Sequence, residues 1–125
     1  ANATPATISP DDMAVIRRQV EGFTAARDRL PELSKLVEER DWTFTRNLIH
    51  GPMQEVSREM LYINQRLLPQ DRAEAKDLAT SLKDALADLD EAARLQDAAK
   101  LQKAYDELES GFTNYATVIP EQALS

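Results

Sequence analysis

Apolar residues recur along the chain at intervals of three and four positions, which is the period of one face of an α-helix. Four such stripes follow one another, over residues 13–37, 49–67, 78–89 and 101–119. No segment alternates apolar and polar residues with the period of two that a strand requires, and the three glycines leave little material for hairpins. The pattern predicts an all-α fold in which four helices, joined by short turns, form an up-down-up-down four-helix bundle.

The first stripe has a clear start and one interruption. Ser9 is a favourable N-cap, Pro10 suits the first helical position, and Asp11 and Asp12 favour the positive end of the helix dipole. Pro31 has no N–H group to donate, so it disrupts a helix close to its own position. The sequence leaves open whether this stripe forms one kinked helix or two short helices.

The second stripe follows a charged turn at residues 38–41 and contains the pair Gly51 and Pro52. Because a proline inside a helix leaves a carbonyl without its partner, we expect a local kink there. Leu68 precedes Pro69, and a residue before proline avoids the helical region of backbone space. The second helix is therefore predicted to end at this pair.

The third helix is predicted to open at Asp71, which has the spacing of a capping box to Glu74. Residues 91–102 contain no Gly or Pro, so the third and fourth stripes could also form one continuous helix. Such a helix would leave its apolar face unburied unless it dimerised. Asp97 is the candidate N-cap of a separate fourth helix, which Pro120 ends.

These boundaries divide the chain into three parts. Residues 1–8, rich in Ala, Thr and Pro, are predicted to be a flexible tether; residues 9–120 form the bundle, and residues 121–125 a C-terminal tail. The chain opens without a signal peptide, as expected of a cytosolic protein or of a mature chain whose targeting segment has been removed.

Composition and charge narrow the classes of partner. The chain has 125 residues, enough for one domain with a core, and 22 acidic against 15 basic side chains give a net charge of −7. This balance disfavours nucleic acid as a partner, because binding to phosphates requires Lys and Arg. It also disfavours a purely electrostatic attachment to anionic lipid. There is no cysteine, which excludes disulfides and covalent haem attachment.

The residues that carry catalytic or metal chemistry are scarce. His50 is the single histidine, so neither the paired Glu-x-x-His ligands of a di-iron bundle nor a four-ligand zinc site can be assembled. The glycines are too far apart for a phosphate loop, and no nucleophile elbow is present. We therefore expect no enzymatic activity and no cofactor, with His50 as a weak candidate for a surface metal site.

A signalling function is the alternative from another class. Histidine phosphotransfer domains are four-helix bundles of this size, and their phosphorylated histidine stands in a His-x-x-Lys-Gly arrangement within an intact helix. Here His50 is followed by Gly51, Pro52, Met53 and Gln54, so the lysine is absent and a proline lies two residues after the histidine.

Trp42 is the single tryptophan and stands just after the charged turn. A tryptophan in this position either packs into the end of the bundle or serves as an exposed anchor of an interface. Arg46 follows one helical turn later, so its guanidinium could stack on the indole.

The run of residues 40–52, Arg-Asp-Trp-Thr-Phe-Thr-Arg-Asn-Leu-Ile-His-Gly-Pro, resembles the start of the second helix in the PsbQ family. It is most similar to the cyanobacterial branch, CyanoQ, in its Asp-Trp, Arg-Asn and Gly-Pro pairs. Residues 60–68 are similar to the continuation of that helix, and the order of helices and turns is similar over residues 9–120.

The resemblance implies an up-down four-helix bundle that acts as a non-enzymatic extrinsic subunit of photosystem II. It would lie in the thylakoid lumen, peripheral to the membrane, with the photosystem II core and other extrinsic subunits as partners. There it would stabilise the oxygen-evolving complex and its calcium and chloride requirement without holding the metals. That branch is anchored through a lipidated N-terminal cysteine, whereas position 1 here is Ala, so the anchor is not present in this sequence. The resemblance marks six interface candidates: Asp41, Trp42, Arg46, Asn47, Gly51 and Pro52.

Overall fold

The computed structural model describes residues 7–124, and this part of the chain contains helices and no strand. The predicted all-α fold is confirmed. The helices are α1 (Pro10–Arg27), α2 (Leu30–Glu38), α3 (Trp42–His50), α4 (Val56–Arg66), α5 (Pro69–Leu95), α6 (Ala98–Ala116) and α7 (Glu121–Leu124).

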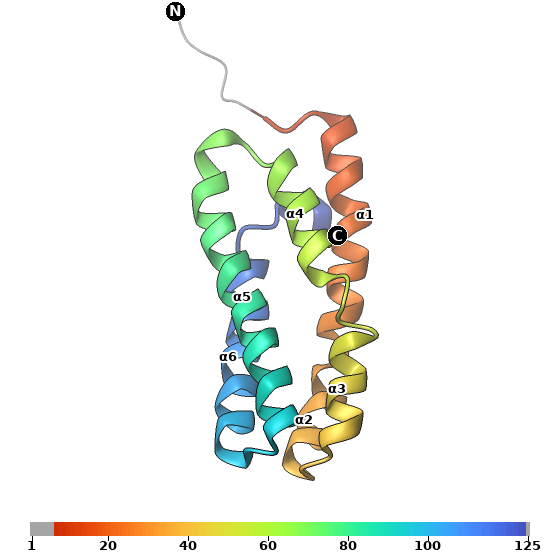
Figure 1. Ribbon diagram of the computed structural model, residues 1–125. Helices are drawn as coiled ribbons and strands as arrows, with labels where there is room; N and C mark the ends of the chain where they lie inside the picture. The colour runs from red at the N-terminus through yellow and green to blue at the C-terminus, as the bar shows by residue number, and fades with distance from the viewer. Residues whose placement is uncertain (1–6, 125) are drawn as a thin grey trace, which may run out of the picture.

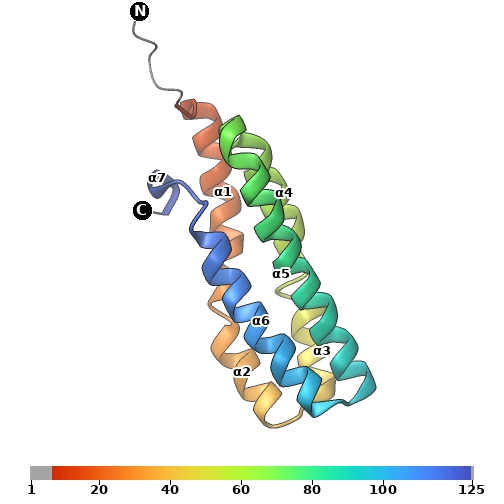
Figure 2. The same ribbon diagram turned by 90° about the vertical axis from the view of Figure 1, so that its left-hand side faces the viewer.

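The helices lie alongside one another as rods, each of which is either one helix or two consecutive helices. Figure 1 shows α2 continuing from α1, α4 continuing from α3, and α5 and α6 each extending along the molecule. The first rod packs on its neighbours through α1 with α4, α2 with α3, and α2 with α6, while α5 packs on α3, α4 and α6. Figure 2 shows the same arrangement from the side, with the short α7 beside α1.

The start of the first rod follows the predicted capping pattern. Ser9 Oγ accepts a hydrogen bond from the backbone N–H of Asp12 at 3.1 Å, and Pro10 occupies the first helical position. Asp28 and Arg29 separate α1 from α2 while keeping right-handed backbone angles. Pro31 lies in the first turn of α2, where its missing N–H has no intrahelical partner to lose. The open alternative is therefore settled in favour of two helices.

The second rod is interrupted more extensively than expected. Instead of a kink at Gly51 and Pro52, the chain leaves the helix at His50 and re-enters it at Val56. The predicted single helix is wrong because Pro52 offers no N–H and Gly51 takes non-helical backbone angles (φ −107°, ψ −102°). Met53 is nevertheless only 1% exposed, so a buried side chain fixes the interruption in the core.

The boundaries of the third and fourth rods confirm one prediction and correct another. The expected capping box at Asp71 is wrong: α5 begins two residues earlier at Pro69, because proline is well placed at the first helical position. Gln96 ends α5 with left-handed backbone angles (φ 56°, ψ 43°). Asp97 then caps α6 by accepting a hydrogen bond from Lys100 N–H at 3.1 Å, so the two helices are separate as predicted.

The two ends of the bundle are packed within the described residues. Residues 1–6 of the predicted tether, and Ser125 of the predicted tail, lie outside the described part, whereas Ile8 packs against the core. Within the predicted tail, α7 buries Ala123, and Arg17 Nε donates to the carbonyl of Gln122 at 3.0 Å. The C-terminal segment is therefore attached to α1.

An aromatic cluster fills the middle of the core. The ring of Phe23 lies 5.3 Å from those of Phe112 and Tyr115, measured between centroids, and meets Tyr115 edge-on at 87°. The hydroxyl of Tyr115 donates to Asn64 Oδ1 at 2.5 Å and also lies 3.2 Å from the Met60 carbonyl. Burial raises the pKa of this hydroxyl, so it remains a neutral hydrogen-bond donor that links α6 to α4.

None of the described helices has both the length and the apolar character that crossing a membrane requires.

Candidate functional site

The start of α3 is fixed by a turn and a cap. Arg40 adopts the left-handed backbone region (φ 55°), and the chain then reverses into α3. Asp41 Oδ1 accepts a hydrogen bond from the backbone N–H of Phe44 at 3.1 Å. Among the six candidates, Asp41 therefore caps the N-terminus of α3, and it sets the position of Trp42 directly after it.

A surface hollow of about 390 Å³ lies between α3 and the C-terminal end of α5. It brings together three of the six interface candidates, along with the histidine and several residues of α5. None of the described residues that line it is acidic. The lining consists of Trp42, Thr43, Arg46, Asn47, His50, Ala93, Arg94 and Gln96.

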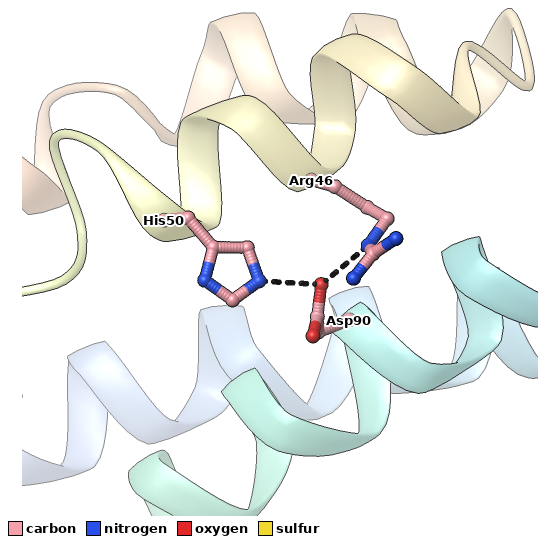
Figure 3. A network of polar contacts seen from close by, with 3 residues as sticks. All are labelled: Arg46, His50 and Asp90. Carbon is pink, nitrogen blue, oxygen red and sulfur yellow. Dashed lines mark hydrogen bonds and ion pairs between the residues drawn. The ribbon is translucent and has the colours of Figure 1, made fainter.

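Arg46 and His50 share one carboxylate at the edge of this hollow (Figure 3). Arg46 Nε donates to Asp90 Oδ1 at 3.0 Å, and His50 Nε2 lies 2.9 Å from the same oxygen. Because a carboxylate only accepts, Nε2 of His50 is the donor in this contact. Partial burial acts to raise the pKa of Asp90, but the bonds from Arg46 and His50 outweigh it and leave this pKa below its ordinary value.

The network ties α3 to α5 and determines where Arg46 points. The guanidinium turns toward Asp90 rather than being held by the stacking on Trp42 that the sequence suggested. Trp42 is half-buried and packs against the core while it also lines the hollow. Trp42 therefore packs into the bundle as one of the two alternatives expected, and its use as an anchor of an interface stays a prediction.

His50 has surroundings that suit neither of the roles considered for it from the sequence. No group of three or more His, Asp or Glu side chains that could hold a metal ion occurs among the described residues. Arg46, which is positively charged and bonded to the shared oxygen of Asp90, also opposes the binding of a metal cation there. A phosphotransfer histidine is expected within an intact helix, whereas His50 is the last residue of α3.

Gly51 and Pro52 lie outside the hollow, in the exposed interruption between α3 and α4. A Cβ atom on Gly51 would approach the backbone carbonyl of Asn47 to 2.9 Å, so a side chain there would force the turn to shift. These two residues shape the end of α3 and do not themselves line the hollow.

The α5 side of the site was not found from the sequence. Asp90 is 44 residues from Arg46, and no local pattern connects them. The one available signal is the register of α5, because Leu86, Leu89 and Ala93 are buried and place Asp90 beside the face that packs on α3.

Replacement of Asp90 by Asn tests the shared carboxylate and its pH dependence. Because folding lowers the pKa of Asp90, its stabilisation is complete above the ordinary carboxyl pKa of about 3.9 and is lost as the pH falls through the folded-state pKa. We expect Asp90→Asn to lower the free energy of unfolding by about 0.5–1 kcal/mol at neutral pH and by less at about pH 3. Denaturant titrations at both pH values measure the difference.

Asp84→Asn is the matched control, because Asp84 is exposed on the same helix. It is expected to change stability little at either pH. A loss for Asp90→Asn that stays equal at the two pH values would contradict a lowered pKa.

Residues 10–120 match the family model of PsbQ, described as oxygen evolving enhancer protein 3. The chain is also 31% identical over 118 residues to CyanoQ from Synechocystis sp., an alignment that covers 94% of this chain and 79% of that relative. The matched residues include α1 to α6 and every residue that lines the hollow.

Proposed function

Because this chain belongs to the PsbQ family, we propose that it is a non-enzymatic extrinsic subunit of photosystem II on the lumenal side of the thylakoid membrane. The observation that carries the proposal is the family match over α1 to α6. In this proposal the four rods act as the up-down-up-down four-helix bundle predicted from the sequence, a rigid body that presents side chains to the photosystem II core and to other extrinsic subunits. A lipid anchor outside this sequence would add attachment to the membrane.

Docking through the hollow between α3 and α5 is the second part of the proposal. The hollow combines a half-buried tryptophan with two arginines, Arg46 and Arg94, and such residues supply much of the binding energy of protein interfaces. Its cations favour a partner surface that presents carboxylates. Trp42, Arg46 and Asn47 would touch the partner, while Asp41, Gly51 and Pro52 hold the backbone that presents them.

Support for the calcium and chloride requirement of the oxygen-evolving complex is the third part. A docked bundle that covers the lumenal surface would slow the exchange of ions and water without binding a metal itself. Oxygen evolution by photosystem II cores, measured at limiting calcium or chloride with and without the added chain, tests this step. Restored activity is expected, and an unchanged ion requirement in cores that bind the chain would contradict it.

Charge reversal at Arg46 tests the docking surface. Arg46→Glu removes a cation from the hollow and places a second carboxylate beside Asp90, so we expect about tenfold weaker binding to photosystem II cores and a small loss of stability. Binding is measured by cosedimentation, and stability and helicity by circular dichroism during unfolding.

The double variant Arg46→Glu/Asp90→Arg separates the two effects, because it restores an ion pair across α3 and α5 with the charges exchanged. Stability is expected to recover while binding stays weak. If binding recovers together with stability, Arg46 acts only on the fold, and this docking surface is wrong.

A further inference from the structure

A groove of about 370 Å³ between α4 and α5 carries positive charge on an otherwise acidic protein. The two helices lie side by side in Figure 1. From α5 the groove receives Arg72, Lys76 and Lys83, and from α4 it receives Leu61 and Gln65. No Asp or Glu lines it in the described part of the chain.

Within residues 7–124, the lysines of this groove have no charged partner. Neither Lys76 nor Lys83 forms an ion pair with a described carboxylate, whereas the α4 arginines Arg58 and Arg66 are each paired. Both lysines are exposed. Each is followed in sequence by an aspartate, Asp77 or Asp84, which projects about 100° further around the helix and does not line the groove. The positive charge is therefore concentrated along one side of α5.

The same groove has an apolar element and a fixed end. Leu61 is 53% exposed beside the buried Ala79, which leaves an aliphatic side chain uncovered in a cationic setting. Arg72 Nε donates to the carbonyl of Leu67 at 2.9 Å, so this guanidinium is held in place before any partner arrives. A pre-positioned cation loses less conformational freedom on binding.

We propose that this groove binds an acidic segment of a partner polypeptide, with carboxylates at Arg72, Lys76 and Lys83 and an apolar side chain over Leu61. The cations span residues 72–83 of α5, about 16 Å, which a helical or extended segment can follow. Lys83 and Asp90 are seven residues apart and point to nearly the same side of α5. The groove and the edge of the hollow therefore lie along nearly the same side of α5, and the inference rests on the proposed function by adding a second contact to that docking surface.

An acidic segment fits the groove better than a flat anionic surface does. A membrane surface would approach the outer side of α5 as well, where Asp77 and Asp84 are exposed, and the whole chain has a net charge of −7. A narrow segment that lies in the groove meets its cations and avoids those carboxylates. Lipid binding is therefore an outcome that the test must separate from peptide binding.

The test compares two charge reversals of equal size on the full chain. Lys76→Glu/Lys83→Glu alters the groove, and Lys100→Glu/Lys103→Glu makes the same change on the other side of α5, between α5 and α6. Cosedimentation with photosystem II cores stripped of their extrinsic proteins measures binding, and circular dichroism confirms that each variant folds. We expect the groove variant to bind about tenfold more weakly and with a smaller dependence on salt, and the control to bind like the parent chain.

Each outcome decides one of the two proposals. If the parent chain binds and both variants bind equally well, or lose affinity equally, the groove is wrong and the proposed function stands. If neither the parent chain nor a form carrying an N-terminal acyl anchor binds, the proposed function fails. Groove-dependent binding to vesicles of anionic lipid, or groove-dependent self-association of the purified chain, would assign the groove to another occupant and overturn the proposal.

A carbodiimide supplies a second measurement on the bound complex, because it joins a lysine amine to a carboxylate in direct contact, forming an amide with loss of water. We expect Lys76 and Lys83 to be linked to the partner. Links through Lys100 and Lys103 alone would contradict the inference.

Discussion

Phe112→Ala is expected to lower the free energy of unfolding by about 3–5 kcal/mol, the largest effect of any single change considered for this chain. Phe112 has 0% of its surface exposed, and its ring lies 5.3 Å from that of Phe23 in the middle of the bundle. Truncation removes a buried aromatic side chain and leaves a cavity that the surrounding rods cannot fill without moving. Denaturant unfolding followed by circular dichroism measures the loss.

Phe44→Ala is the control for this prediction, since the same substitution is made where the side chain is 61% exposed on α3. It is expected to change stability by less than about 1 kcal/mol, because the Phe44 side chain buries little apolar surface and its removal loses little. Similar losses for the two variants would show that the core is not where the structure places it.

Gly111→Val is expected to destabilise the bundle by about 1–3 kcal/mol. Gly111 lies on the face of α6 that packs on α5, and a Cβ atom there would stand 3.2 Å from Leu82 Cα and 3.3 Å from its Cβ. The backbone of Leu82 can give way only if the two helices separate. Valine is no worse a helix former than glycine, so a loss of stability would come from the contact between helices.

Gly22→Ala provides the comparison, because the atoms nearest to the added Cβ belong to the carboxylate of Glu59. Burial and the nearby Glu55 raise the pKa of Glu59, so its charged form is poorly accommodated where it stands. This flexible side chain can turn toward solvent, and alanine favours the helix by up to about 1 kcal/mol. Thermal unfolding should show unchanged or higher stability for Gly22→Ala, and a loss as large as that of Gly111→Val would contradict this account of the two contacts.

The features that the sequence predicted correctly are those set by neighbouring residues. The period of three and four positions identified the buried faces, and the caps at Ser9 and Asp97 follow from side chains that bond to N–H groups three residues later. The choice between one long helix and two was resolved by Gln96, whose left-handed backbone ends α5. A glutamine gives little sequence signal for that conformation. The sequence therefore indicated the break only through Asp97, the N-cap of α6.

The features that escaped prediction depend on packing or on distant residues. The interruption at Gly51 and Pro52 extends to residue 55 because Met53 is drawn into the core, and a local argument from proline gives only a kink. The α5 part of the candidate site was likewise missed, because Arg46 and His50 lie on α3 whereas Asp90 lies on α5, far away in sequence. Among the six candidates from the sequence, the hollow contains Trp42, Arg46 and Asn47, and whether they touch a partner stays a prediction.

Binding of the purified chain to photosystem II cores stripped of their extrinsic proteins, measured by cosedimentation at low and high salt, tests the central claim most directly. The account predicts saturable binding at low salt that weakens as salt is added, because the docking surfaces present arginine and lysine side chains to acidic partners. Absence of binding at both salt concentrations, by the chain alone and by a form carrying an N-terminal acyl anchor, would contradict it.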